Sequence, residues 1–224
     1  MTKTKRSVRV AISIVTVAVS ACLYATSFAQ AESNLPPGKV LFEDKFDQKE
    51  LGKGWAWLRE HKEAWRLQNG GLEVQIEPGV ADTCKNVLLR EAPDRAKGSW
   101  AIEVTVTSLK APIQQYEQAG ITWYSEGKPV FKLVKELVNG QLVIVPGHKP
   151  MTEESVRLRL VATADSWTAF YQPGAKGPFL EAASGKLPPP GKDQVSLTCY
   201  NGPPEAEHWV RFQDFRITEV PNSR

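Results

Sequence analysis

The chain has 224 residues, with 28 lysines and arginines against 25 aspartates and glutamates. Four of the basic residues lie in the first 31 positions, which hold no acidic residue, so 28 less four leaves 24 basic residues against 25 acidic ones. A chain without a basic excess is not expected to bind nucleic acid, whose phosphates are contacted by clustered lysine and arginine. The remaining length suits one domain.

Residues 1–31 are predicted to be a signal peptide. Lys3, Lys5, Arg6 and Arg9 precede an apolar run from residue 10 to about residue 25, and "AQA" at residues 29–31 supplies the small residues of a cleavage site. We therefore expect export to the periplasm or the extracellular space, with residues 32–38 as an N-terminal linker.

Cys22 offers an alternative to a freely exported protein. It follows "VSA", so lipidation at this cysteine would anchor the chain to a membrane. The next residues, "LYATSF", are apolar where a lipoprotein normally has a polar tether, which favours cleavage after Ala31. The apolar run is short for a retained membrane span. Contact with a membrane is expected only if Cys22 is lipidated.

Strand patterns follow one another from residue 40 to residue 220. "GLEVQIEPG" and "WAIEVTVTSL" alternate apolar and polar residues, which predicts inward-facing Ile102, Val104 and Val106 with Glu103 outward. "QAGITWYSEGKPVFKLVKELVNGQLVIV" predicts three strands, with a hairpin turn at Asn139-Gly140. "WAWLREHKEAWRLQNGG" at residues 55–71 predicts a strand, a loop and a second strand entering a hairpin. Ten to twelve short strands indicate an all-β antiparallel sandwich or barrel at residues 39–220, followed by a tail at 221–224.

Several stretches together resemble a bacterial family. "WAWLREHKEAWRLQNGGLEVQ", "NVLLREAP", "YEQAGITWY", "VRLRLVATADSWTAFYQPG" and "VRFQDFRI" are similar in order and spacing to the concanavalin A-like domain at the C-terminus of β-xylosidase-type glycoside hydrolases. The same domain also occurs as free-standing bacterial domains of unassigned function. The resemblance covers residues 39–220 and implies a jelly-roll sandwich of two antiparallel sheets, one of them concave.

The resemblance also implies an accessory role, because in xylosidases this domain accompanies a separate catalytic domain. Two loops depart from the family pattern, "QPGAKGPFLEAAS" after the second tyrosine-containing strand and "SEGKPVF" after the "QAG" strand. Ligand contacts made by those loops in relatives are therefore not transferred to this chain.

No catalytic residue is predicted. Sandwich glycosidases place two carboxylates on one strand face, and no E-x-D-x-E pattern exists here. The three histidines, at positions 61, 148 and 208, lie in different loops without zinc-ligand spacing, so no metal site and no cofactor are expected. A structural calcium ion is an alternative, with oxygens from Glu43, Asp44 and Asp214 if the first and last strands are adjacent.

Sugar-binding sites combine aromatic rings with polar side chains. If Val87 and Leu89 point inward, Arg90 points outward. If Ala119, Ile121 and Trp123 point inward, Gln118, Thr122 and Tyr124 point outward, with Gly120 leaving room above the sheet. The ligand-binding residues predicted on this basis are Trp57, Arg59, Arg90, Glu103, Gln118, Thr122, Tyr124 and Lys132. An alternative for Trp57 and Trp65 is that they close the edge of the core.

Three functions are open at this point. The first is an exported, non-catalytic, lectin-like sandwich whose partner is a glycan or polysaccharide. The second is a glycoside hydrolase or lyase that uses a cross-strand carboxylate pair, and the third is an envelope protein-interaction domain without a sugar site. Cys84 and Cys199 are either a disulfide pair, which export would permit, or two buried thiols.

Overall fold

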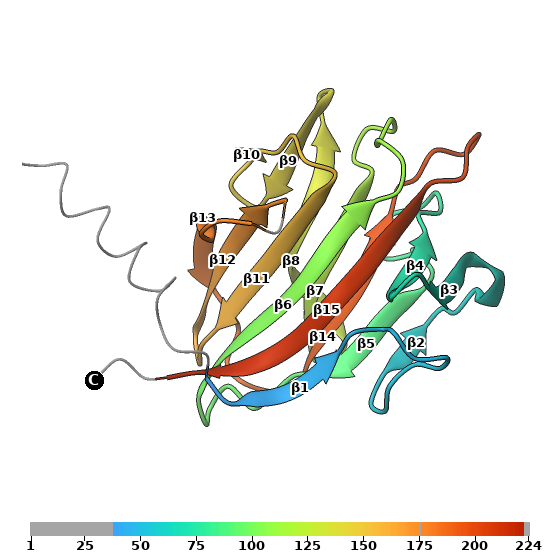
Figure 1. The fold of residues 1–224 in the computed structure, drawn as a ribbon. Helices are drawn as coiled ribbons and strands as arrows, with labels where there is room; N and C mark the ends of the chain where they lie inside the picture. The colour runs from blue at the N-terminus through green and yellow to red at the C-terminus, as the bar shows by residue number, and fades with distance from the viewer. Residues whose placement is uncertain (1–37, 175, 222–224) are drawn as a thin grey trace, which may run out of the picture. The chain divides into compact units, whose positions relative to one another are not determined.

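A computed structural model describes residues 38–174 and 176–221, which form two antiparallel sheets packed face to face (Figure 1). The predicted signal peptide, Cys22, most of the linker and residues 222–224 lie outside the described residues. Sheet A contains, in spatial order, β13 (Leu180–Lys186), β12 (Ser166–Pro173), β11 (Ser155–Ala162), β6 (Ser99–Ser108), β15 (Trp209–Val220), β4 (Gly71–Gln75) and β3 (Trp65–Gln68), and β1 (Val40–Asp44) pairs with β15. Sheet B contains β10 (Lys149–Pro150), β9 (Gln141–Val145), β8 (Lys128–Val138), β7 (Gln118–Ser125), β14 (Asp193–Tyr200), β5 (Val87–Glu91) and β2 (Ala56–Leu58).

The prediction of an all-β sandwich of two antiparallel sheets is confirmed. The turn at Asn139-Gly140 joins β8 to β9, and both residues have positive φ, at 51° and 76°. This is the conformation of a tight two-residue hairpin, in which asparagine and glycine are the favoured residues. Asn69-Gly70 does the same between β3 and β4, with φ of 53° and 66°. Two strands were not predicted: β13, which begins within the "QPGAKGPFLEAAS" stretch, and the two-residue β10.

The stretch at residues 55–71 crosses from one sheet to the other. β2 pairs with β5 in sheet B, a short 3-10 helix at Lys62–Ala64 follows, and β3 pairs with β4 in sheet A. Trp57 and Trp65 therefore meet at one edge of the sandwich, with ring centroids 5.0 Å apart. Both pack against the core, as the alternative interpretation expected.

Alternating side chains of both sheets fill the interior. Ile102, Val104 and Val106 of β6 meet Ile121 and Trp123 of β7 there. These five side chains are buried, as expected of a core packed at the density of an organic crystal. The inward direction predicted for both strands is confirmed.

The direction predicted for β5 is wrong. Leu88 belongs to the main core, while Val87 packs with Cys84 and Tyr124 on the outer side of sheet B. "NVLLRE" is apolar on both faces because the loop at residues 77–86 covers the outer face at this point, so alternation alone does not say which face is inside. Arg90, on the same face as Leu88, therefore lies on the side opposite to the predicted one.

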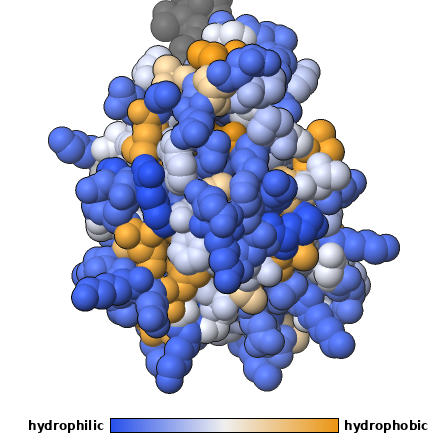
Figure 2. Space-filling model, turned by 90° about the vertical axis from the view of Figure 1, so that its right-hand side faces the viewer, coloured by the Kyte–Doolittle hydropathy of each residue, from blue (hydrophilic) through white to orange (hydrophobic). Residues whose placement is uncertain are grey.

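No helix in the described part of the chain is both long and apolar enough to cross a membrane. Figure 2 views the β2–β4 side of the molecule and shows a mainly hydrophilic surface with small, separate hydrophobic patches. A large continuous apolar patch, which a protein-interaction domain without a sugar site would need, is not visible on that side.

Candidate functional site

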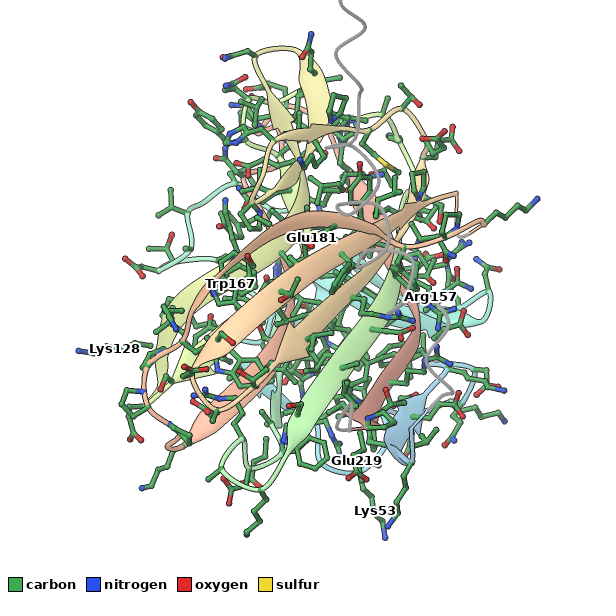
Figure 3. The ribbon with its side chains drawn as sticks, turned by 90° about the vertical axis from the view of Figure 1, so that its left-hand side faces the viewer. Lys53, Lys128, Arg157, Trp167, Glu181 and Glu219 are labelled. Carbon is green, nitrogen blue, oxygen red and sulfur yellow. The ribbon has the colours of Figure 1, made fainter. Side chains whose placement is uncertain are left out.

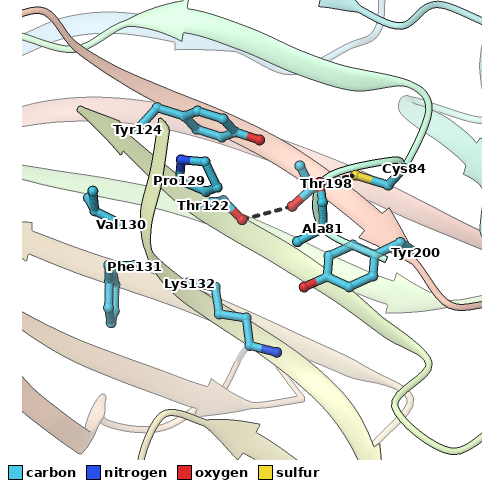
Figure 4. A pocket seen from close by; sticks show the side chains of 10 residues that line it. All are labelled: Ala81, Cys84, Thr122, Tyr124, Pro129, Val130, Phe131, Lys132, Thr198 and Tyr200. Atoms are coloured by element: carbon cyan, nitrogen blue, oxygen red, sulfur yellow. Dashed lines mark hydrogen bonds between the residues drawn. The ribbon is translucent and has the colours of Figure 1, made fainter. Parts of the chain in front are cut away.

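The outer face of sheet B carries a groove of about 390 Å³ (Figure 4). Strands β7, β8 and β14 form its floor, and the loop at residues 77–86 forms one wall. Its lining residues are Ala81, Cys84, Thr122, Tyr124, Pro129, Val130, Phe131, Lys132, Thr198 and Tyr200. This volume lies in the range of small-ligand sites, which combine apolar walls with a few polar groups.

Strand pairing places the polar side chains of the floor. Thr122 of β7 lies opposite Ser196 of β14. Thr198 lies two residues further along β14, on the same face, opposite Gly120. The hydroxyls of Thr122 and Thr198 are 3.0 Å apart and hydrogen-bonded. A side chain at Gly120 would collide with the backbone of β8, since an added Cβ would lie 2.2 Å from the carbonyl oxygen of Leu133. The glycine therefore serves close strand packing and not, as we predicted, space above the sheet.

A hydrogen-bonded triad lies at one end of the groove. The Lys132 ammonium donates to Gln118 Oε1 at 2.7 Å and to Glu136 Oε2 at 3.0 Å, and Gln118 Nε2 donates to Glu136 Oε1 at 3.2 Å. Gln118 and Glu136 are buried, whereas the Lys132 side chain keeps one third of its surface exposed. The triad holds the ammonium at the groove, where it retains donor capacity for a ligand oxygen.

Tyr124 and Tyr200 supply the aromatic surface of the groove. Burial, together with the nearby Glu136 carboxylate and the Cys84 sulfur, raises the pKa of Tyr200 to about 12. Burial also raises the pKa of Tyr124. Both phenols therefore remain protonated at neutral pH. The Tyr200 ring is partly exposed to the groove, whereas Tyr124, 5% exposed, packs against Cys84 and Val87 and only borders it.

Arg59 fixes the loop that forms the wall. Its Nε donates to the Cys84 carbonyl at 2.6 Å, and its guanidinium lies 3.8 Å from the Cys84 sulfur. Arg59 has a φ of 58°, so the chain turns after β2 and the side chain reaches the outer side of sheet B although Trp57 points inward. Arg59 supports the groove through the loop and is not among its lining residues.

The structure brings together four of the predicted binding residues, Gln118, Thr122, Tyr124 and Lys132, on one face. The other four, Trp57, Arg59, Arg90 and Glu103, do not line the groove. Trp57 packs on Trp65 at the core edge, and Arg59 lies behind the wall.

Arg90 and Glu103 are the two clearest corrections. The Arg90 guanidinium lies 3.2 Å from the centroid of the Phe42 ring and donates to the Lys53 carbonyl, away from the groove. Glu103 points outward as predicted, but from β6 in sheet A and not from the sheet that carries the groove. The prediction failed because alternation gives the direction of a side chain and not the sheet in which its strand lies.

Thr198, Tyr200 and Glu136 were missed by sequence reasoning. "QVSLTCYNG" alternates Val195, Leu197 and Cys199 with Ser196, Thr198 and Tyr200, and the first set is in the core. That alternation was sufficient to predict Thr198 and Tyr200 on the outer face, once β14 was known to pair with β7.

The two cysteines are not paired. Cys199 points into the core, where it approaches the Gln75 carbonyl, while Cys84 lies on the outer side of the same sheet. The backbone of sheet B therefore separates the two sulfur atoms, and both cysteines are free thiols. Burial raises the pKa of both thiols, which makes them less reactive toward alkylating reagents.

For the protein cleaved after Ala31, which lacks Cys22, we expect slow reaction with iodoacetamide at pH 7.5 in the folded state. After unfolding without reductant, it should take up two equivalents, one each at Cys84 and Cys199, as measured by mass spectrometry. Uptake only after reduction would contradict this.

Of the three residues weighed for calcium, Asp44 has other hydrogen-bond partners. β1 and β15 are adjacent, as that alternative required, but Asp44 accepts hydrogen bonds from the Phe46 amide at 2.8 Å and from Trp55 Nε1 at 2.9 Å. Within residues 38–174 and 176–221, no three His, Cys, Asp or Glu side chains gather closely enough to hold a metal ion. His208 is buried and bonded to Glu117 at 2.7 Å.

Comparisons with known proteins agree with the fold. Residues 43–172 match the family described as the β-xylosidase C-terminal concanavalin A-like domain. No curated protein matches the chain. Among solved structures, the GH43 protein BlXynB from Bacillus licheniformis is 18% identical with a TM-score of 0.66, over 80% of this chain and 39% of that one.

Two further structures are similar. The xyloglucan-locus protein GH43B of Bacteroides ovatus is 18% identical with a TM-score of 0.65, over 84% of this chain and 41% of its own. A functionally unknown protein from Saccharomyces cerevisiae is 12% identical with a TM-score of 0.51, over 75% of this chain and 98% of its own. This chain thus spans about two fifths of the length of the two GH43 proteins. At these identities, the structural likeness concerns the fold.

Proposed function

This chain belongs to the β-xylosidase C-terminal concanavalin A-like domain family, and we propose that it is an exported, non-catalytic glycan-binding domain that assists polysaccharide processing. The observation that carries this proposal is the groove on sheet B. There, the rings of Tyr124 and Tyr200 lie beside the hydroxyls of Thr122 and Thr198 and the ammonium of Lys132.

These groups suit a sugar. A pyranose ring has apolar C–H faces for aromatic contact and hydroxyls at its edge for hydrogen bonding. The two threonine hydroxyls and the Lys132 ammonium lie within the same groove as the rings, so one sugar unit could contact both kinds of group. Among the structures of similar fold, one is a xylan β-1,4-xylosidase and another is the GH43B protein of a xyloglucan locus, so xylo-oligosaccharides and xyloglucan oligosaccharides are the first candidates.

A hydrolase is the second candidate, and the carboxylates argue against it. Glu136 lies beside the groove, but both of its oxygens are bonded to Gln118 or Lys132. Asp82 lies in the adjoining loop and is exposed. General acid–base catalysis on a glycosidic bond needs two carboxylates facing the same sugar, one of them protonated.

Isothermal titration calorimetry with xylohexaose and xyloglucan oligosaccharides tests the proposal. Tyr200→Ala removes a ring from the groove and is expected to weaken binding by about five- to tenfold. Tyr116→Ala is the matched control, because Tyr116 is exposed and is not a lining residue. Equal losses in the two variants, or no binding by the folded wild-type protein to any neutral glycan tested, would contradict the proposal.

A second measurement separates binding from catalysis. The wild-type protein is incubated with the same oligosaccharides, and products are followed by chromatography. We expect no cleavage. Cleavage that Glu136→Gln abolishes while binding persists would instead support the hydrolase.

A further inference from the structure

The outer face of sheet A, on the opposite side of the sandwich from the groove, holds two buried glutamates surrounded by arginines. Glu73 of β4 has 1% of its side chain exposed. Arg66 of β3 contacts its Oε2 at 2.8 Å, and Arg211 of β15 contacts its Oε1 at 2.6 Å. Gln68 and Asn69 also donate to this carboxylate, and together these hydrogen bonds lower its pKa against the opposing effect of burial.

Glu103 of β6 is the centre of the second cluster, with 2% of its side chain exposed. Arg157 and Arg159 of β11 approach it at 2.9 Å each, and Arg216 of β15 at 2.8 Å. Figure 3 views the molecule from the β12–β13 edge, with sheet A in profile and Arg157 labelled toward the right-hand side. Three guanidinium groups around one carboxylate are more than charge neutralisation requires.

The two clusters together carry a positive excess. Five arginines surround two glutamates, and the arginine side chains remain 22–46% exposed. Three other carboxylates lie on this face: Glu43, across from Arg216 on β1, Asp214 in the irregular part of β15, and Glu181 of β13, across β12 from Arg159. All three are exposed, and within the described residues none is at ion-pair distance from these arginines, so the positive excess is confined to the two clusters. The arginines therefore keep free donor capacity toward solvent.

Aromatic rings hold the outermost arginines in place. The Arg66 guanidinium lies 4.1 Å from the ring centroid of Trp209, and that of Arg159 lies 3.7 Å from the ring centroid of Phe179. Stacking of this kind orients the planar fork of arginine, which matches a carboxylate bidentately. These arginine side chains are already ordered without a ligand, so binding would cost less side-chain conformational entropy.

We propose that the outer face of sheet A binds an acidic polysaccharide through its carboxylate groups. β4 and β6 lie on either side of β15, so the two clusters are two strand spacings, or about 10 Å, apart. A polymer that carries carboxylates at intervals can contact both clusters, whereas one small anion cannot. The choice of a polysaccharide rests on the proposed function, but the face is separate from the groove and is tested separately.

Gln213 allows a test that leaves every arginine in place. It lies on β15 between Arg211 and Arg216, opposite Thr105 of β6. Gln213→Glu adds a negative charge between the clusters, and Gln213→Lys adds a positive one. The matched controls are Gln141→Glu and Gln141→Lys, at the exposed start of β9 in sheet B.

Affinity electrophoresis in gels that contain polygalacturonate, at 20 mM and 300 mM NaCl, is the measurement. We expect the wild-type protein to be retarded at low salt and much less at high salt. We expect Gln213→Glu to weaken binding about fivefold and Gln213→Lys to strengthen it about fivefold, with both controls unchanged.

Each other outcome overturns the proposal. Equal effects in the Gln141 variants would show a response to net charge, not to this face. No retardation of the folded wild-type protein would remove the site. Tighter binding to vesicles of phosphatidylglycerol and phosphatidylcholine than to polygalacturonate would make the partner a lipid surface. Loss of neutral-glycan binding in Tyr200→Ala with polygalacturonate binding intact is the result expected if both proposals hold, so failure of one is distinguishable from failure of the other.

Discussion

Replacing Arg95 with alanine is expected to destabilise the protein by about 3–5 kcal/mol, because it leaves a buried carboxylate without its counter-ion. Arg95 Nε donates to Asp193 Oδ2 at 2.7 Å, and both side chains are almost fully buried. The terminal nitrogens donate to the carbonyls of Thr163, Ala164 and Pro188. Arg95 thus joins β14 to the turn between β11 and β12 and to the connection between β13 and β14, both more than 60 residues away from it in the sequence.

Thermal unfolding followed by circular dichroism checks this prediction. For a domain of this size, the loss corresponds to a fall in Tm of between about 6 and 20 °C. Lys97→Ala is the control, since Lys97 pairs with Asp94 on the surface of the same loop and its removal should leave Tm unchanged. The double variant Arg95→Met with Asp193→Leu should recover part of the loss. A Tm for Arg95→Ala equal to that of wild type would show that the buried pair contributes nothing.

Replacing Lys135 with methionine is expected to stabilise the protein at pH 7. Lys135 has 3% of its surface exposed and donates to the Glu154 carbonyl. Burial lowers its pKa from 10.5 to about 8. Between these two values the unfolded chain binds a proton that the folded chain does not, so stability rises with pH across that window and is lowest below pH 8.

The magnitude follows from the pKa. The fall in the Lys135 pKa means that the charged lysine lowers the free energy of unfolding by roughly 3 kcal/mol at pH 7. Replacing the lysine removes this loss, but it also removes a hydrogen bond that contributes about 1 kcal/mol. Lys135→Met should therefore be more stable than wild type by about 2 kcal/mol at pH 7, with a smaller gain at pH 9.5. Urea unfolding at both pH values measures the difference.

Lys132→Met is the control for this prediction. It makes the same substitution on the same strand but removes the partner of the buried Glu136, so it should destabilise at pH 7. A Lys135→Met variant less stable than wild type at pH 7, or a gain that does not change with pH, would contradict the assigned cause.

Local sequence patterns determined much of the fold. The alternation in β6, β7 and β11 and the Asn-Gly pairs at positions 69–70 and 139–140 act through neighbouring residues alone, so strands and hairpins were predictable. The same alternation predicted that Gln118, Thr122 and Tyr124 share a face. These three residues lie on one strand, so their common face was predictable from the sequence alone.

Tertiary structure decided which strands share a sheet and which face of each is covered. Glu103 and Gln118 are both outward positions of strands with alternating sequences, yet their strands, β6 and β7, lie in different sheets. Arg90 was misplaced because β5 is apolar on both faces, and Arg59 because a positive φ interrupts the alternation after β2. The two arginine clusters join residues up to 138 positions apart. The physical reason is that alternation states only that neighbouring side chains point in opposite directions, whereas the partner of each strand is selected by long-range packing of the whole chain.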